Sequence, residues 1–223
     1  GFSRPGVAVF DHFRTAPANE GGPHYRLGPL CMLAEANIEA GSGFPVHDHA
    51  ELEIVSYMVA GALTHADTAG HRGTIGPGDM QVMTTGRGIR HSETNEGGAP
   101  VRMYQMWIDA AVAGLPPSYV DVPRPKRGLS GTLQVLVSGV DTLPGRARIN
   151  QNAAILAAQL EPGQTAGHAI GAGRQVYVLA PRGKLSVNGA ELGARGGAIV
   201  RDEKRLVIRA LEDSDVLVID LPP

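Results

Sequence analysis

Glycine and proline divide this chain into many short apolar runs, and this punctuation constrains the fold more than any other feature. The 223 residues include 30 Gly and 16 Pro, which leaves little room for long helices and favours an all-β architecture. Runs such as MLAEANI and VRMYQMWI alternate apolar and polar residues as half-buried strands do. In the first half we expect strands near residues 28–38, 51–60, 62–66, 79–84 and 100–109.

The second half repeats the style of the first. YMVAGALTHAD (57–67) resembles YVLAPRGKLSVNG (177–189), because each reads as a strand, a Gly-centred turn and a return strand. IGPGDMQVM (75–83) likewise resembles LGARGGAIV (192–200). This internal echo predicts two copies of one β-barrel unit.

A proline-rich stretch, VAGLPPSYVDVPRPKR at 112–127, interrupts the strand pattern and looks like a connector. We therefore expect an N-terminal domain at residues 1–120 and a C-terminal domain at 121–223. The helical signal is weak, and we expect at most one or two short turns, near 111–120 and in RPKRGLSG.

Composition excludes several classes of partner. Hydrophobic content of 43% and charged content of 19% are typical of a globular protein with a core. The net charge of −2 predicts no direct nucleic-acid binding, and the RPKR cluster at 124–127 is more typical of a linker than of a binding patch. No apolar run approaches the roughly 20 residues that span a bilayer, and no signal peptide is visible. We expect a cytoplasmic protein without a membrane partner.

The cysteine content is compatible with a cytoplasmic setting. Cys31 is the single cysteine, so no disulfide within the chain and no CxxC site can form. It lies in the apolar stretch GPLCMLAEANI, which predicts a buried hydrophobic side chain rather than a nucleophile.

Two histidine pairs carry the chemistry, HDH at 47–49 and HSE at 91–93. Residues two apart in a strand point to the same face, so adjacent strands would offer three imidazoles and a carboxylate from His47, His49, His91 and Glu93. This set is typical of a site for a divalent transition metal. Glu53 has the same parity as His49, so strand spacing alone leaves Glu53 and Glu93 both open as the fourth ligand.

The two pairs lie in strings that resemble the signature motifs of the cupins. The first motif is filled by Gly41, His47, His49, Glu53 and Gly61, with its last interval one residue longer. The second is matched by Gly78, Thr84, Gly86, His91 and Asn95. Thr84 replaces a proline there, and the interval from glycine to histidine is two residues longer.

The sequence strings that contain these departures resemble those of one branch of the cupins. GDMQVMTTGRGIRHSE (78–93) closely resembles the signature GDxQxMTAGRGIxHSE of the pirin family. FPVHDHAELEIVSY, LTHADTAGHRGTI and RMYQMWI resemble further stretches of that family. The similarity is dense over about 41–109 and weaker, but in register, through the second half.

The resemblance to pirins implies a fold and a metal. Pirins are bicupins, with two face-to-face double-stranded β-helix (jelly-roll) barrels and metal in the N-terminal one only, so the C-terminal domain is expected to be degenerate and metal-free. The resemblance implies that His47, His49, His91 and Glu93 are the ligands. Iron is the expected ion, with Mn, Ni, Cu and Zn as alternatives that the nitrogen and oxygen ligands also suit.

The resemblance also implies two functions. Members of the family show quercetin 2,3-dioxygenase activity, which implies metal-dependent cleavage of a flavonol or a similar enolic or phenolic substrate with O₂, with Glu93 as the proton acceptor. The eukaryotic pirin is an iron-containing nuclear coregulator, which leaves open a non-enzymatic, redox-responsive regulator that binds a protein partner. Family members often carry Arg after the HxH pair, where this chain has Ala50, and this difference predicts an altered pocket mouth.

Further side chains are candidates for the surroundings of the metal. If Glu93 is the ligand, Glu53 is expected to orient a ligand imidazole or to be an ordinary surface charge. Alternate residues of barrel strands face inward, so pocket candidates are Tyr57, Met80, Val82, Arg87, Gln105 and Trp107.

The remaining histidines and two arginines carry weaker expectations. His65 and His71 flank a turn, and we expect both to be solvated turn or barrel-mouth residues. His12, His24 and His168 are isolated in the sequence. Arg87 and Arg90, in the loop GRGIRH, could hold an anionic ligand or brace the loop.

Overall fold

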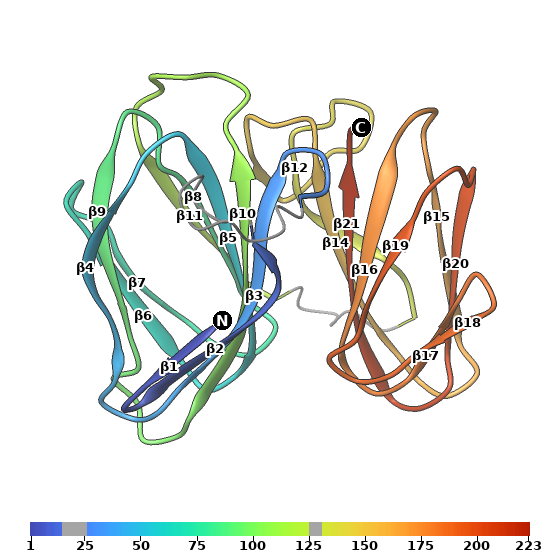
Figure 1. Ribbon diagram of the computed structural model, residues 1–223, viewed down its shortest axis with the longest axis horizontal. Coiled ribbons are helices and arrows are strands. Elements are labelled where there is room, and N and C mark those ends of the chain that lie inside the picture. The colour runs from blue at the N-terminus through green and yellow to red at the C-terminus, as the bar shows by residue number, and fades with distance from the viewer. Residues whose placement is uncertain (15–25, 125–130) are drawn as a thin grey trace. The chain divides into compact units, whose positions relative to one another are not determined.

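The computed structural model describes residues 1–14, 26–124 and 131–223, and these residues form strands, turns and loops without a helix (Figure 1). The predicted all-β class is confirmed. In the described part of the chain no helix could cross a membrane. His24, and the part of the RPKR cluster and RPKRGLSG that falls at 125–130, lie outside the described residues.

The chain divides into two compact units. Unit 1 comprises Gly1–Pro123 with Ile149–Gln151, and unit 2 comprises Arg124–Arg148 with Asn152–Pro223. The strands of unit 1 are β1 (Phe2–Arg4), β2 (Val7–Arg14), β3 (Leu30–Ile38), β4 (Gly43–His49), β5 (Leu52–Ala60), β6 (Leu63–Asp67), β7 (Arg72–Ile75), β8 (Met80–Thr84), β9 (Ile89–Thr94), β10 (Val101–Asp109) and β11 (Ser118–Val122). They form two sheets, in the orders β1-β2-β3-β10-β5-β8-β11 and β4-β9-β6-β7.

Unit 2 is built in the same way. Its strands are β12 (Gln134–Ser138), β13 (Ala147–Arg148), β14 (Ala154–Leu160), β15 (Thr165–Ala169), β16 (Gln175–Arg182), β17 (Leu185–Val187), β18 (Ala190–Leu192), β19 (Gly197–Val200), β20 (Arg205–Ala210) and β21 (Ser214–Leu221). The two sheets have the orders β13-β12-β14-β21-β16-β19 and β15-β20-β17-β18.

The strand orders confirm the internal repeat. β3-β10-β5-β8 in unit 1 corresponds to β14-β21-β16-β19 in unit 2, and β4-β9-β6-β7 corresponds to β15-β20-β17-β18. The turn between β5 and β6 holds Gly61, and the matching turn between β16 and β17 holds Gly183, with φ of +73° and +82°. A Cβ at Gly61 would lie 2.6 Å from the Pro100 carbonyl oxygen, so both conformation and space favour glycine there.

The segment 112–127 is only partly a connector. Ser118–Val122 forms β11, which pairs antiparallel with β8 along its whole length. Prolines flank this strand rather than interrupt it, so the backbone N–H groups that pairing needs are present. The boundary that we expected after residue 120 therefore falls inside a strand of unit 1.

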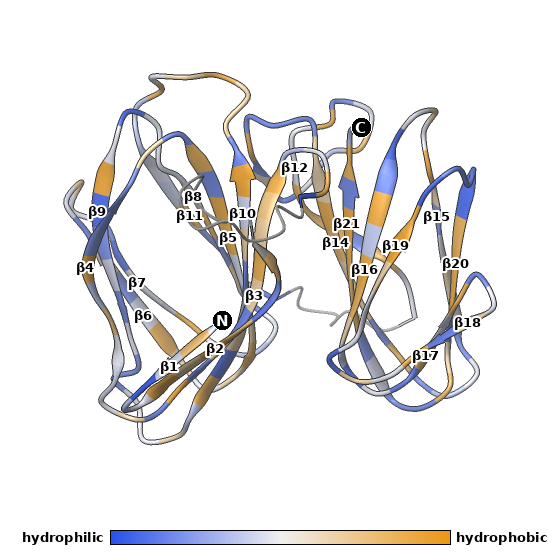
Figure 2. Ribbon diagram, in the orientation of Figure 1, coloured by the Kyte–Doolittle hydropathy of each residue, from blue (hydrophilic) through white to orange (hydrophobic). Residues whose placement is uncertain are grey.

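Each unit encloses an apolar core between its two sheets, as expected for packed β-layers. The core of unit 1 includes Met32, Ile38, Met58 and Met103, and the larger core of unit 2 includes side chains of β14, β16, β20 and β21. Figure 2 shows hydrophobic residues concentrated along β3 and β5 of unit 1 and β14 and β16 of unit 2. In unit 1 this core is interrupted by polar side chains where β4 and β9 meet.

Candidate metal centre

Strand pairing brings the two histidine motifs together. β4 runs antiparallel to β9, and the register places His47 opposite His91. A bulge between Phe44 and His47 shifts the register just before the HDH motif, and bulges of this kind often re-aim side chains beside functional sites. One ring nitrogen from each of His47, His49 and His91 lies within 4.8 Å of the others. The three imidazoles can therefore hold one metal ion.

Hydrogen bonding leaves nitrogen lone pairs available at this cluster. The Nδ1 atom of His47 lies 2.8 Å from the Pro45 carbonyl oxygen, so Nδ1 donates and, in the neutral ring, the lone pair is on Nε2. The Nε2 atom of His91 is buried and has no hydrogen-bond partner among the described residues. A buried unpartnered nitrogen is costly, and ligation of a metal ion would account for it.

The local environment also keeps the imidazoles of His49 and His91 neutral. Burial, with the nearby His47, lowers the pKa of His49 to about 4. Burial likewise lowers the pKa of His91 to about 3, with further contributions from His47, His65 and His49. Both rings are therefore unprotonated at neutral pH, as metal ligation requires.

Glu93 lines the same cavity as His47 and is held by an amide. It lies on the same face of β9 as His91 and is 2% exposed, and this burial raises its pKa. Gln105 Nε2 donates to both carboxylate oxygens, at 3.1 and 3.0 Å, and Trp107 Nε1 donates to Gln105 Oε1 at 2.8 Å. Glu93 is not part of the three-histidine group, so its ligation stays a prediction.

Glu53 has neither of the roles that we expected if Glu93 is the ligand. It is 0% exposed, so it is not a surface charge. Its carboxylate accepts hydrogen bonds from Thr84 Oγ1 at 2.7 Å and from the backbone N–H and side chain of Asn150 at 2.9 and 3.0 Å. It projects from the face of β5 opposite to Ser56, whose hydroxyl meets Gln105. The carboxylate therefore anchors Asn150 and does not orient an imidazole.

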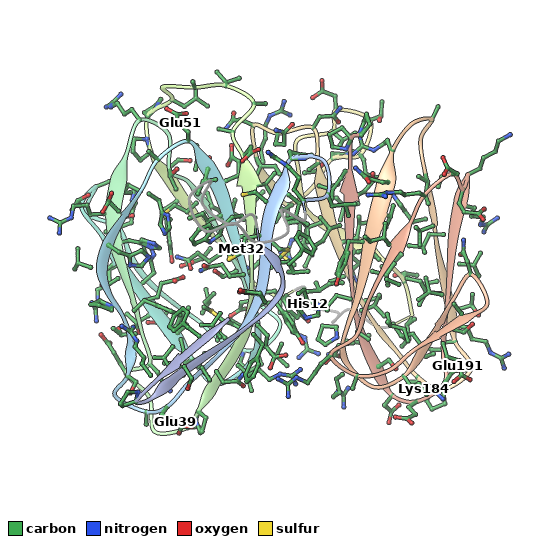
Figure 3. All side chains as sticks on the ribbon, in the orientation of Figure 1. His12, Met32, Glu39, Glu51, Lys184 and Glu191 are labelled. Atoms are coloured by element: carbon green, nitrogen blue, oxygen red, sulfur yellow. The ribbon has the colours of Figure 1, made fainter. Side chains whose placement is uncertain are left out.

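The cavity beside the histidines has a volume of about 160 Å³ and is mainly apolar. Met32, labelled in Figure 3, lines it from β3. The other lining residues are Phe2, Val9, Ala34, Ala36, Phe44, His47, Glu93, Met103, Gln105 and Trp107. Such walls suit a flat apolar ligand with a few polar groups at one end.

Two of the six pocket candidates, Gln105 and Trp107, line this cavity, and four do not. Tyr57 pairs with Met80, and Val82 lies two residues beyond Met80 on the same face of β8. That face is opposite to the one that carries Ser56 and Gln81, so all three side chains point away from the cavity. Arg87 lies exposed in the turn between β8 and β9.

His65 is a correction to the sequence interpretation, because it is buried rather than solvated. It is 1% exposed, and its Nδ1 lies 3.3 Å from Nδ1 of His91. Its Nε2 lies 3.0 Å from Oδ2 of Asp67. A signal was present, because THAD places His65 and Asp67 two apart in a predicted strand, with the same parity argument as HDH. His71, in contrast, has a side chain that is 38% exposed, as expected.

Several other candidates are not part of the three-histidine group. Arg90 and Ala50 are exposed. In unit 2, His168 Nε2 lies 2.6 Å from Asp220 Oδ2. Cys31 is half-buried, and burial, with Asp109 nearby, raises its pKa to about 11. The thiol therefore stays protonated, which fits the expected packing role.

The positions of unit 2 that correspond to His91 and Glu93 carry apolar side chains, whereas His168 stands opposite Leu206 as His47 stands opposite His91. Leu63 and Leu185 each begin the strand after the matched glycine turn, so His65 corresponds to Val187. His65 pairs with Glu93, and Val187 pairs with Ile208. Ile208 and Leu206 therefore stand where β9 has Glu93 and His91, and both are fully buried in the core of unit 2.

Comparison with known proteins agrees with this geometry. The Pirin family model matches residues 9–108, and that of the quercetinase C-terminal cupin domain matches 136–221. A pirin-like protein of Caulobacter vibrioides is 38% identical, with 86% of this chain and 83% of that protein covered. A quercetin 2,3-dioxygenase of Escherichia coli is 33% identical, covering 92% of this chain and 88% of that protein.

A solved structure matches the whole fold. The structure of a bacterial pirin from Escherichia coli in complex with nickel(II) superposes with a TM-score of 0.87 at 29% identity, covering 100% of this chain and 94% of that one. The matched families, the relatives and the two cupin-type units agree with the resemblance seen in the GRGIRHSE string. The chain therefore belongs to the pirin family.

Proposed function

We propose that this protein is a metal-dependent dioxygenase of quercetinase type, which cleaves a flavonol or a similar enolic or phenolic substrate with O₂. One observation carries the proposal: three imidazoles converge beside a buried carboxylate at the wall of an apolar cavity. The name of the Escherichia coli relative, a quercetin 2,3-dioxygenase, supports the same reaction class.

The ligand roles follow from the donor set. His47, His49 and His91 hold the ion, and Glu93 is the fourth ligand. Nitrogen and oxygen donors suit iron, which we expect, and also Mn, Ni, Cu and Zn. When bound, the ion supplies Lewis acidity that lowers the pKa of a substrate hydroxyl, together with open positions at a redox-active centre.

The chain itself binds the substrate and moves one proton. The apolar walls from Phe44, Met103 and Trp107 pack against the substrate rings and exclude water. Glu93, whose pKa is raised by burial, accepts the proton of the substrate hydroxyl, because a stronger base is a better acceptor. Gln105 keeps that carboxylate in place through both oxygens. Both atoms of O₂ enter the product, and one ring carbon of a flavonol leaves as carbon monoxide.

The experiment has two stages. Elemental analysis of protein purified without an affinity tag identifies the ion, and His47→Ala should lower the metal content because it removes one of three imidazoles. Protein loaded with Fe or Mn should then consume O₂ and release carbon monoxide from quercetin. Normal metal content in His47→Ala would overturn the site. No turnover with any of Fe, Mn, Ni, Cu or Zn would overturn the flavonol assignment.

Unit 2 is proposed to bind no metal ion. The support is that Leu206 and Ile208 occupy the positions of His91 and Glu93, and neither side chain offers a ligand atom. A metal-to-protein ratio of one is therefore expected, and a ratio of two would contradict this assignment.

A further inference from the structure

A series of side-chain hydrogen bonds leads from the histidine cluster through His65 and Asp67 of β6 to the partly exposed His71. β6 pairs antiparallel with β9, and the register sets His65 beside Glu93 and Asp67 beside His91. His91 Nδ1 lies 3.3 Å from His65 Nδ1, and His65 Nε2 lies 3.0 Å from Asp67 Oδ2. The side chains of His65 and Asp67 are 2% and 0% exposed. The contact sequence is thus His91, His65, Asp67, with water excluded from both buried side chains.

The proton positions along this chain follow from the chemistry of the groups. The Asp67 carboxylate can only accept, so His65 Nε2 must carry the hydrogen that it shares with Asp67. With one ring hydrogen placed on Nε2, the Nδ1 of His65 can only accept, so the donor in the next bond is the Nδ1–H of His91. A neutral His91 protonated on Nδ1 leaves its lone pair on Nε2, which is the buried nitrogen without a partner at the cluster.

The orientation of Asp67 is set by its other hydrogen bonds. Its Oδ1 accepts from the backbone N–H groups of Ala69 and His71, at 2.9 and 3.0 Å. Its Oδ2 faces the Nδ1 of His71 at 3.0 Å as well as His65. The backbone donors prevent the carboxylate from rotating, so Oδ2 stays directed at His65.

Stacking on the ring of Tyr119 restricts the orientation of the His65 and His71 imidazoles. Tyr119 of β11 stacks on His65, with ring centroids 4.4 Å apart and planes inclined by 25°, and on His71 at 5.6 Å and 17°. Its hydroxyl donates to Asp121 Oδ1 at 2.6 Å. Gly73 leaves room for this pair, because a Cβ there would lie 2.6 Å from the Tyr119 hydroxyl oxygen.

We propose that His65 and Asp67 are positioning residues that keep His91 protonated on Nδ1, with Nε2 directed at the metal ion as an electron-rich ligand. The inference rests on the metal site of the proposed function but not on the dioxygenase reaction. A hydrogen bond from the distal nitrogen of a ligating histidine fixes its tautomer and raises its basicity. Neither His65 nor Asp67 contacts the ion.

Asp67→Asn is the sharpest test, because it keeps the shape and reverses the polarity. The Asn oxygen stays on the two backbone N–H groups, so its NH₂ faces His65 and makes Nε2 an acceptor. His65 then carries its hydrogen on Nδ1 and opposes the Nδ1–H of His91. His65→Leu removes the acceptor altogether. His65→Gln restores it, because the amide oxygen can accept from His91 while the amide nitrogen donates to Asp67.

The affinity readout uses Zn²⁺ alone, measured by competition with a chelating dye. We expect Asp67→Asn and His65→Leu to bind Zn²⁺ about 10- to 100-fold more weakly than the parent chain, the usual effect of losing such a partner, and His65→Gln to stay within about threefold. The matched control is Asp220→Asn in unit 2, which alters a similar His–carboxylate contact and should leave Zn²⁺ affinity unchanged.

The second readout is the tautomer of His91 in metal-free protein, from long-range ¹H–¹⁵N NMR of the histidine rings. The parent chain should show His91 protonated on Nδ1, and Asp67→Asn should show it protonated on Nε2. Unchanged Zn²⁺ affinity in both Asp67→Asn and His65→Leu would overturn the positioning role, as would a His91 tautomer that is the same in all variants. A parent chain that binds no Zn²⁺ would instead overturn the metal site itself.

Discussion

The amide of Gln105 holds both carboxylate oxygens of Glu93, with Nε2 at 3.1 Å from Oε1 and 3.0 Å from Oε2. Two donor contacts to a buried carboxylate partly offset the desolvation that raises its pKa. The contact also orients Glu93 toward the cavity that it shares with His47. Gln105 is therefore the link between the cavity wall and the candidate base.

Gln105→Leu should destabilise the metal-free protein in a pH-dependent way. At neutral pH the Glu93 carboxylate would lose both donors, at a cost of about 1–3 kcal/mol in the free energy of unfolding. A carboxyl whose folded pKa is raised loses stability as pH rises above its ordinary value of 4.5, so the cost should shrink near pH 4. Urea unfolding of Gln105→Leu at the two pH values measures this. An equal loss at both, or a loss that Glu93→Gln fails to suppress, contradicts it.

The histidine cluster should make the metal-free protein sensitive to acid. The folded pKa values of His49 and His91, about 4 and about 3, lie below their ordinary value of 6.5. The unfolded chain therefore binds more protons in this window, and stability falls as pH drops from 6.5 toward these values. The slope should reach about 1.4 kcal/mol per pH unit for each histidine. Denaturant titrations across the window give the slope, and a His91→Asn variant should show a shallower one.

Ala36→Leu should separate substrate binding from metal binding. Ala36 lines the cavity from β3, and extra methylene groups there would take up space needed by the substrate rings. We expect a loss of at least about tenfold in kcat/KM for quercetin, the scale of a misfitting methylene in an apolar pocket, with unchanged Zn²⁺ affinity. The control is Ala8→Leu, on β2 beside Val9 but on the other face of the sheet. Full activity in Ala36→Leu would show that substrate binds elsewhere.

Gly86→Ala should cost more stability than Gly70→Ala, although both glycines have positive φ, +48° and +91°. A Cβ at Gly86 would lie 2.0 Å from the Leu115 carbonyl oxygen, whereas a Cβ at Gly70 meets nothing within 4 Å. Left-handed backbone costs about 1–2 kcal/mol for either alanine, and Gly86→Ala must also displace the Leu115 segment, which leads into β11. Thermal unfolding of the two variants compares them directly. Equal losses would mean that the Leu115 segment moves aside without cost.

Much of this fold could be predicted from short-range pattern. The five strands expected in the first half correspond to β3, β5, β6, β8 and β10, because alternation of apolar residues follows directly from the pleat of a strand. The internal echo predicted the duplicated strand order, and the turn glycines at 61 and 183 mark it. β11 was missed, because the prolines around it resemble a connector when its partner β8 is not in view.

The histidine site illustrates the division between sequence and structure most clearly. Spacing of two determined that His47 and His49 share a face of one strand, and that His91 and Glu93 share a face of a second strand, because side chains alternate along any strand. Alternation does not say which face is enclosed. Tyr57, Met80 and Val82 therefore passed as pocket candidates, and Glu53 as a partner of the imidazoles, until the packing of β5 and β8 placed them on the opposite face.

Pattern in the sequence was enough to predict five strands of the first half, the family and the residues able to ligate a metal. The packing of the sheets was needed to show that β6 lies beside β9, which buries His65 and Asp67 against His91. It was also needed to show that Gln105 rather than Glu53 meets the cavity. The physical reason is that strand periodicity is a local property of the chain, whereas the register between strands distant in sequence depends on how both faces of each sheet are packed.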